Sequence, residues 1–184
     1  MQRQFKDLSL EELDIPAKVI AGLAGRVWKS GNYPILLLSG KMGAGKTTFS
    51  ARIVFALLDF FGDPTDKKSI YVNSPTYTIL NEYPFALTKN DTGEPLTIYH
   101  FDLFRVGSEE EVGDLGFEEY WGTKGISLVE WWERAPSEFS NRKYTIRIRL
   151  EEEKEESRKI ELELSGSEWK NEEYRSLLLS PLEK

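Results

Sequence analysis

The stretch Gly40-Lys41-Met42-Gly43-Ala44-Gly45-Lys46-Thr47 decides the fold of this chain. It spells G-x-x-x-x-G-K-T, the phosphate-binding P-loop, and the apolar run 35–38 that precedes it reads as a buried strand. The residues that follow, 48–58, carry Phe49, Ile53 and Ala56 at helical spacing. The pattern therefore predicts a strand–loop–helix unit, which is the context that a working P-loop requires.

The predicted loop has the chemistry of an anion site. Glycines let successive backbone N–H groups turn toward a phosphate, and the start of the helix adds the positive end of its dipole. We expect Lys46 to contact the β- and γ-phosphates and the Thr47 hydroxyl to ligate Mg²⁺. The residues expected to hold the nucleotide are Met42, Gly43, Ala44, Gly45, Lys46, Thr47 and Thr48.

Composition limits the classes of protein to which the chain can belong. Its 184 residues suit one domain, and the absence of cysteine excludes disulfides and thiolate metal sites. No apolar run approaches the roughly 18 residues of a membrane span, and the first residues do not resemble a signal peptide, so a cytoplasmic protein without membrane contact is expected. The net charge of −7 argues against binding nucleic acid through a broad basic surface, although a partner could hold the nucleic acid.

A P-loop needs a carboxylate near Mg²⁺, usually at the end of a neighbouring strand. Glu130 ends the apolar run 126–129, and Asp102 ends the run 98–101, so both are candidates. Glu130 is preferred as the metal ligand, because the run before it reads as the more central strand.

The segment Ser74-Pro75-Thr76-Tyr77-Thr78 is a candidate switch loop, in which Thr76 could sense the γ-phosphate or its Mg²⁺. It is also ordinary turn chemistry. His100, the single histidine, fits a packed group better than a general base. Of the adjacent tryptophans, Trp131 is expected at the surface of the nucleotide site and Trp132 in the core, because adjacent strand residues point in opposite directions.

The remaining pattern predicts an α/β protein, a P-loop NTPase-like three-layer sandwich with a mixed parallel and antiparallel sheet, in a single domain over 1–184. The sequence N-K-x-D, by which GTPases recognise guanine, is absent. The match to D-x-x-G at 59–62 lies at the expected end of a helix rather than after a strand, so it is treated as chance, and ATP is preferred over GTP. The expected helices follow the capping box at Ser9 and Glu12, begin at a cap formed by Ser108, and cover residues 167–179. Single strands are expected at 70–72 and 126–130. Two hairpins are expected, one of 77–83 with 96–102 and one of 144–150 with 157–164, the second with an acidic tip at 151–156.

Together these motifs resemble the TsaE (formerly YjeE) family, the ATPases of bacterial tRNA threonylcarbamoyladenosine synthesis. The resemblance covers about 9–165, with 166–184 as an extension. The segments that carry it are Gly43-Ala44-Gly45-Lys46-Thr47-Thr48-Phe49, Ser74-Pro75-Thr76-Tyr77-Thr78, Tyr99-His100-Phe101-Asp102-Leu103-Phe104-Arg105, Leu115-Gly116-Phe117 and Leu128-Val129-Glu130-Trp131.

The resemblance implies an ATP- and Mg²⁺-dependent partner of the TsaD–TsaB complex, which transfers a threonylcarbamoyl group to the adenosine beside the anticodon. ATP hydrolysis would be weak alone and stimulated by the complex, and tRNA would be met only through it. The resemblance implies Thr47 and Glu130 as metal ligands and Lys46, Asp102, Glu130 and Thr76 as the catalytic set.

Two alternatives remain open, a small-molecule or nucleoside kinase and an adaptor that binds ATP without appreciable hydrolysis. A kinase would be expected to add an arginine-bearing lid, which the scattered arginines do not suggest. Three departures from the family pattern are Lys41-Met42 where the family has Asp-Leu, a long segment at 84–96, and the tail beyond Leu164.

Overall fold

The P-loop lies between a central strand and a long helix, as the sequence predicts. In the computed structural model, which describes residues 1–154 and 157–179, strand β2 (Ile35–Ser39) leads through the loop into helix α2 (Lys46–Phe61). Every side chain of the apolar run is buried: Leu36 and Leu38 join the core beneath the long helices, while Ile35 and Leu37 join a second core on the opposite face. This burial on both faces explains why the run does not alternate with polar residues.

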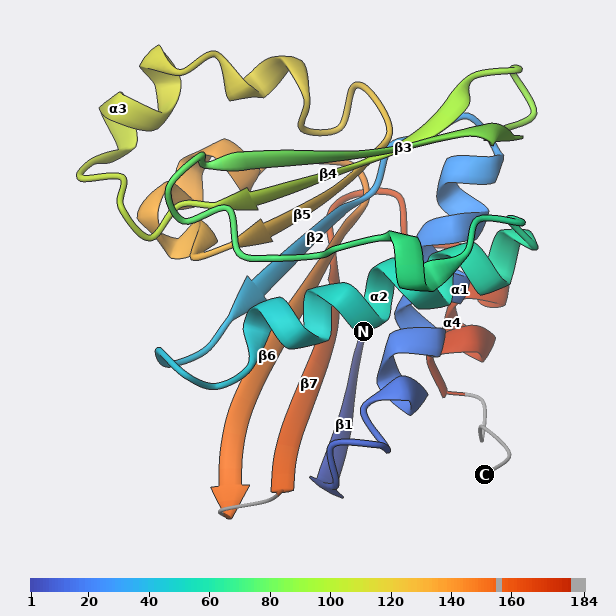
Figure 1. Cartoon of the computed structure of the whole chain (residues 1–184), viewed down its shortest axis with the longest axis horizontal. Coiled ribbons are helices and arrows are strands. Elements are labelled where there is room, and N and C mark those ends of the chain that lie inside the picture. The colour runs from blue at the N-terminus through green and yellow to red at the C-terminus, as the bar shows by residue number, and fades with distance from the viewer. Residues whose placement is uncertain (155–156, 180–184) are drawn as a thin grey trace.

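The sheet has seven strands in the order β1-β7-β6-β2-β5-β4-β3 (Figure 1). Strands β4, β5, β2 and β6 run parallel to one another. On one side β3 pairs antiparallel with β4, and on the other β7 pairs antiparallel with β6 and β1 antiparallel with β7. The predicted mixed sheet is therefore confirmed. The other strands are β1 (Gln2–Leu8), β3 (Leu80–Lys89), β4 (Pro95–Asp102), β5 (Ile126–Glu130), β6 (Thr145–Lys154) and β7 (Ser157–Ser165).

Helices cover both faces and make the predicted three layers. Helices α1 (Asp14–Lys29), α2 and α4 (Glu172–Leu179) pack on one face around the larger core. The opposite face is covered over β2, β5 and β4 by an aromatic group that includes Trp121 and Phe139, supplied by α3 (Glu109–Asp114) and the segments after it. The short 3₁₀ helices are η1 (Lys67–Ser69), η2 (Phe117–Glu119), η3 (Trp132–Arg134) and η4 (Pro136–Phe139).

Several local predictions are confirmed by hydrogen bonds. The Ser9 backbone N–H donates to the Glu12 carboxylate (3.0 Å) and the Glu12 N–H donates to Ser9 Oγ (3.3 Å), the reciprocal pair of a capping box, although this pair closes a turn and α1 itself begins only at Asp14. Ser108 caps α3 by accepting from the Glu111 N–H at 3.3 Å. Among the described residues, no helix has the length and apolar character needed to cross a membrane.

Other element predictions were wrong. Residues 70–72 form no strand, because the sheet edge beside β4 is occupied by β3. Strand β3 starts at Leu80 rather than residue 77 and runs through Lys89, so most of the long segment 84–96 is hairpin strand. The terminal helix begins only at Glu172, and β1 was not predicted. The expected acidic tip is mostly the end of β6, while residues 155–156 lie outside the described part.

Candidate nucleotide-binding site

The loop 40–45 turns the chain from β2 into α2 through glycines with positive φ angles. Gly43 has φ +80° and Gly45 has φ +96°, values that residues with a Cβ rarely adopt. At Gly40, with φ +146°, an added Cβ would lie 2.5 Å from the carbonyl oxygen of Leu150 on β6. The glycines therefore hold a tight loop at the amino end of a 16-residue helix, where N–H groups without helical partners favour an anion.

Lys46 is the first residue of α2 and turns back over this loop. Its Nζ donates to the carbonyl oxygens of Gly40 (2.9 Å) and Lys41 (3.1 Å), and it lies 3.8 Å from the ring centroid of Trp131. Burial lowers the pKa of Lys46, while the nearby carboxylates of Glu130 and Asp102 act in the opposite direction. The ammonium group is thus poorly hydrated and close to negative charge, and it lies where it can contact an incoming phosphate.

Glu130 ends β5 and reaches the start of α2. Its side chain is 2 % exposed. Oε2 accepts a hydrogen bond from Thr47 Oγ1 at 3.2 Å, and Oε1 accepts from Ser50 Oγ at 3.1 Å. Oε1 also lies 2.8 Å from His100 Nε2. The strand-end carboxylate and the P-loop threonine are therefore in direct contact, the pairing that a P-loop Mg²⁺ site uses.

Asp102 ends β4 and holds the candidate switch loop. Its Oδ2 accepts hydrogen bonds from Ser74 Oγ (2.8 Å) and Thr76 Oγ1 (2.5 Å), and its Oδ1 accepts from the Phe104 N–H (2.9 Å). The backbone of the loop is also tied to β4, since the Asp102 N–H donates to the Ile79 carbonyl at 3.0 Å. Ile79 has φ +66°, an unusual conformation for a β-branched residue, so this loop end is held in a strained form.

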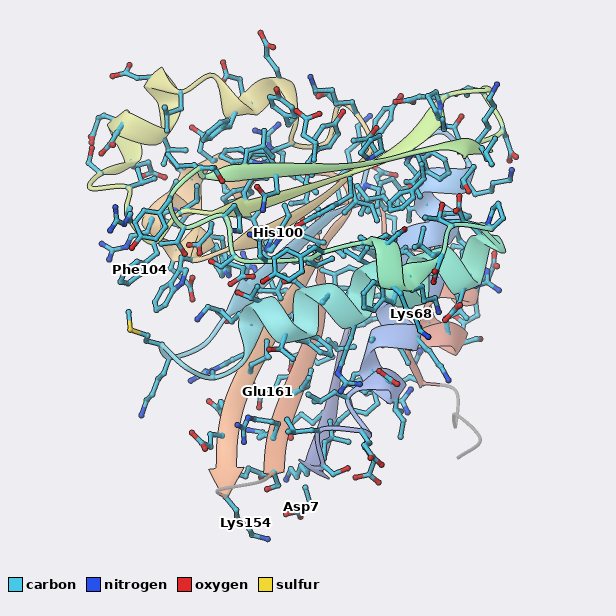
Figure 2. The ribbon with its side chains drawn as sticks, in the orientation of Figure 1. Asp7, Lys68, His100, Phe104, Lys154 and Glu161 are labelled. Carbon is cyan, nitrogen blue, oxygen red and sulfur yellow. The ribbon has the colours of Figure 1, made fainter. Side chains whose placement is uncertain are left out.

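These groups line one pocket of about 310 Å³. Its aromatic side is made by Phe104 and Trp131, whose ring centroids lie 5.1 Å apart. Figure 2 places Phe104 near the end of the sheet where the P-loop lies in Figure 1. Predicted residues that line the pocket are Met42, Gly43, Gly45, Lys46, Thr47, Thr76, Asp102 and Glu130.

Two predicted residues lie differently. Ala44 is buried behind the loop, and the Thr48 side chain is exposed on α2 beside another hollow. Trp131 lines the nucleotide pocket as expected, but the expectation that it is exposed and Trp132 lies in the core was wrong, because both are half-buried. Trp131 has φ +60°, so the chain leaves the strand there and the strand rule for alternating side chains no longer applies.

The contacts of Ser50 and His100 with Glu130 were not predicted. Ser50 lies three residues after Thr47, and that spacing brings both hydroxyls to the same face of a helix, a signal that was available. His100 reaches Glu130 only because β4 and β5 are neighbours, which follows from the strand order.

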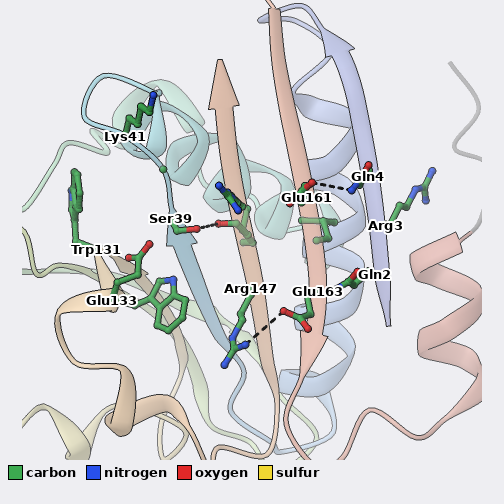
Figure 3. A pocket seen from close by; sticks show the side chains of 15 residues that line it. Gln2, Arg3, Gln4, Ser39, Lys41, Trp131, Glu133, Arg147, Glu161 and Glu163 are labelled. Carbon is green, nitrogen blue, oxygen red and sulfur yellow. Dashed lines mark hydrogen bonds and ion pairs between the residues drawn. The ribbon is translucent and has the colours of Figure 1, made fainter. Parts of the chain in front are cut away.

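A larger hollow of about 630 Å³ lies beside the loop on the outer face of β6, β7 and β1 (Figure 3). Some of its polar groups already pair with one another: Arg147 lies 3.6 Å from Glu163, and the Gln4 amide donates to Glu161 at 2.9 Å. This hollow contains neither Lys46 nor the two strand-end carboxylates. The smaller pocket is therefore the better candidate for nucleotide chemistry.

The donor set of the smaller pocket fits Mg²⁺ bound together with a nucleotide. Within residues 1–154 and 157–179 no three His, Cys, Asp or Glu side chains form a cage for a metal ion. Mg²⁺ commonly binds to one or two protein oxygens and completes its shell with phosphates and water. Thr47 Oγ1 and Glu130 Oε2, which are 3.2 Å apart, supply such a pair of oxygens.

Comparison with known proteins gives a consistent result. The family model described as "Threonylcarbamoyl adenosine biosynthesis protein TsaE" matches residues 13–160. A Bacillus subtilis protein named "tRNA threonylcarbamoyladenosine biosynthesis protein TsaE" is 38% identical over 130 residues, which cover 71% of this chain and 66% of that protein. A Haemophilus influenzae protein of the same name is 37% identical over 100 residues, covering 54% and 52%. The chain thus spans between half and two thirds of these two relatives.

A solved structure also resembles the whole fold. The crystal structure of Bacillus subtilis YdiB superposes with a TM-score of 0.59 and 25% sequence identity, covering 96% of this chain and 91% of that one. The similarity therefore extends beyond the P-loop to the arrangement of the sheet and helices.

Proposed function

The chain belongs to the TsaE family, and from this premise we propose that it is an ATP- and Mg²⁺-dependent ATPase of tRNA threonylcarbamoyladenosine biosynthesis. The observation that carries the proposal is the contact between Thr47 and the buried Glu130, at the start of a P-loop helix and within the pocket that Lys46 lines. Neither residue type alone would be informative, but their pairing is the arrangement that Mg-nucleotide binding needs.

The P-loop, the strand-end carboxylates and Thr76 have separate proposed roles. The N–H groups of 42–48 and the Lys46 ammonium bind the phosphates, and the loop carbonyls that Lys46 contacts give way to phosphate oxygens, which are stronger acceptors. Thr47 and Glu130 would hold Mg²⁺, which neutralises phosphate charge when it is bound. Because phosphoryl transfer depends mainly on positioning and electrostatics, no strong base is needed among the protein groups.

Asp102 and Thr76 are proposed to control hydrolysis. Asp102 lies in the same pocket as Glu130, where its carboxylate can orient water. In this structure both oxygens of Asp102 are engaged by Ser74, Thr76 and Phe104. Hydrolysis by the isolated chain is therefore expected to be slow, and the loop 74–78 must rearrange before Asp102 and Thr76 can act.

The proposed partner is the TsaD–TsaB complex, with tRNA met only through it and with a cytoplasmic location. The net charge of −7 supports a role in which other subunits hold the tRNA. The docking surface is proposed at the rim of the pocket, around 74–78. Tyr77 there is 82% exposed and is stacked by Arg105, at 4.2 Å from the ring centroid, a combination that interfaces favour.

The kinase alternative receives less support. In the described part of the chain no arginine lines the P-loop pocket. Arg142 instead donates to the carbonyl oxygens of Glu138 and Trp121, and Arg147 stacks on Trp132. An arginine clamp on a transferred phosphoryl group would have to come from elsewhere.

The deciding experiment measures ATP turnover by the full chain with and without purified TsaB–TsaD, together with capture of the complex in ATP, ADP or no nucleotide. Slow turnover alone, stimulation by the complex and capture that depends on ATP are expected. The Thr76→Ala variant should lose that nucleotide dependence. Turnover of the isolated chain on the order of 1–100 s⁻¹, as in kinases, would refute the proposal, and so would capture that is equal under all three conditions.

A further inference from the structure

His100 is the one histidine of the chain and has no role in the function proposed above. It lies in β4 with a fully buried side chain, and Figure 2 places it between the sheet and α2. Full burial keeps it from water, and it is not among the residues that line the nucleotide pocket. It therefore cannot act directly on a substrate, and any role in the chemistry must pass through a neighbouring residue.

The imidazole points at one oxygen of Glu130. His100 Nε2 lies 2.8 Å from Glu130 Oε1, and because a carboxylate accepts hydrogen bonds, Nε2 must carry the hydrogen. The other ring nitrogen, Nδ1, is buried and has no hydrogen-bond partner among the described residues. A buried polar atom without a partner destabilises the folded state. An apolar side chain would avoid that cost, so the bond to Glu130 is the evident use of a histidine here.

The two oxygens of Glu130 are thereby given different tasks. Oε1 accepts from both His100 and Ser50, whereas the P-loop hydroxyl of Thr47 is the one donor to Oε2 among the described residues. Two donors on one oxygen fix the rotation of the carboxylate. The oxygen that remains faces the residue proposed to share a metal with Glu130.

We propose that His100 is a positioning residue that fixes the Glu130 carboxylate, so that Oε2 is presented beside Thr47 to an Mg²⁺-nucleotide. This inference rests on the proposed function, because it assumes that Glu130 serves the metal. Partners that orient the ligands of a metal typically change metal affinity by about 10- to 100-fold when they are removed.

The test compares three substitutions of His100 in the full chain. His100→Phe keeps a ring but loses both nitrogens. His100→Gln can place an amide N–H near the position of Nε2, whereas the side chain in His100→Asn is too short to reach Glu130. For each variant, fluorescent ADP binding is titrated with Mg²⁺ and repeated in EDTA. We expect His100→Phe and His100→Asn to need an Mg²⁺ concentration higher by about tenfold or more to strengthen ADP binding as much as in wild type. His100→Gln should stay close to wild type, and binding in EDTA should be unchanged in all three.

Two further variants separate the possible results. Ser127→Ala alters another buried polar residue of β5, whose Oγ has no hydrogen-bond partner in the described structure, and it should keep the wild-type Mg²⁺ response. Glu130→Gln tests the premise. If Glu130→Gln loses the Mg²⁺ response and His100→Phe keeps it, the positioning role is refuted while the proposed function stands. If Glu130→Gln also keeps it, the metal assignment itself fails.

The comparison of His100→Gln with His100→Asn decides whether His100 positions Glu130 or only fills space. Equal Mg²⁺ responses of His100→Gln and His100→Asn would overturn the inference, and this comparison remains available if His100→Phe does not fold. Because the chain has a single histidine, ¹⁵N-labelled histidine gives one set of imidazole signals. The hydrogen is expected on Nε2, and a spectrum with the hydrogen on Nδ1 would contradict the contact on which the inference depends.

Discussion

Asp102 lies directly opposite Glu130 in the parallel pairing of β4 and β5, yet the two carboxylates contact different parts of the chain. Glu130 contacts α2 through Thr47 and Ser50, while Asp102 contacts the loop that contains Ser74 and Thr76. The pair Asp102 and Glu130 therefore links the P-loop helix, which forms the fixed part of the nucleotide pocket, to the loop 74–78, which is proposed to move. Variants of the two residues should separate these functions.

The first prediction concerns that separation. Glu130→Gln should weaken Mg²⁺-dependent nucleotide binding by about tenfold or more, because it removes a charged metal ligand. Asp102→Asn should leave binding within about twofold of wild type and lower turnover in the presence of TsaB–TsaD, since its proposed role is in hydrolysis. Calorimetry and a phosphate-release assay on both variants check this. The reverse pattern would exchange the two assignments.

Lys46 supplies the second prediction. Lys46→Ala should cost about 2–3 kcal/mol of ATP binding, because a charge-assisted hydrogen bond to phosphate is lost. Calorimetry with ATP and Mg²⁺ measures the difference. Lys18→Ala, which removes an exposed lysine on α1, serves as the control and should bind as wild type does. Equal affinity of Lys46→Ala and the control would be incompatible with the P-loop assignment.

The third prediction concerns the stability of the loop. Gly40→Ala should lower the free energy of unfolding by about 2 kcal/mol or more, because alanine meets both a strained φ angle and the Leu150 carbonyl. Gly113→Ala in α3, where an added Cβ meets no atom within 4 Å, is the matched control. It should be neutral or stabilising by up to about 1 kcal/mol. Urea unfolding of both variants measures the effect, and equal losses would contradict the close approach at Gly40.

The fourth prediction uses the pH dependence of Asp63, which follows α2. Burial alone would raise its pKa, but hydrogen bonds from Thr65 and Thr88 outweigh burial, and the pKa of Asp63 lies below its usual value. The stabilisation is therefore complete above the unfolded-state pKa of about 3.9 and is lost as the pH falls through the folded-state pKa.

Asp63→Asn should accordingly reduce the free energy of unfolding by about 1–2 kcal/mol at neutral pH, as expected for hydrogen bonds to a charged group. The difference from wild type should shrink below about pH 4. Unfolding curves at a series of pH values test this, with the exposed Asp114→Asn as the control. A difference that stays constant down to pH 2 would show that the charge of Asp63 is not responsible.

How well an element could be predicted depended on how local its signal is in the sequence. The P-loop unit and the final hairpin were predicted because their patterns lie within short windows. Strand β1 was missed because only Phe5 and Leu8 are buried in it and its partner is β7, at the other end of the chain. Residues 70–72 have the composition of a strand, but whether a strand forms there depends on a free neighbour in the sheet.

The same distinction applies to the site. Lys46, Thr47 and Glu130 could be identified from motifs, and the structure brings them into one pocket. The bond between His100 and Glu130 could not be predicted, because it requires β4 to lie beside β5 and both side chains to point toward α2. The half-buried position of Trp131 follows from its left-handed backbone conformation, for which the sequence carries no glycine or asparagine signal.

Strand β1 also has a protective consequence. It covers β7, which would otherwise form the outer edge of the sheet with unpaired backbone N–H and C=O groups. Open edges of this kind invite pairing with other chains, and positively charged residues such as Arg3 and Lys6 on a covering strand discourage it. We therefore expect the first eight residues to limit self-association. A chain that begins after Leu8 should accordingly form oligomers or aggregates, which light scattering would detect as an increased molar mass, even if it still binds nucleotide.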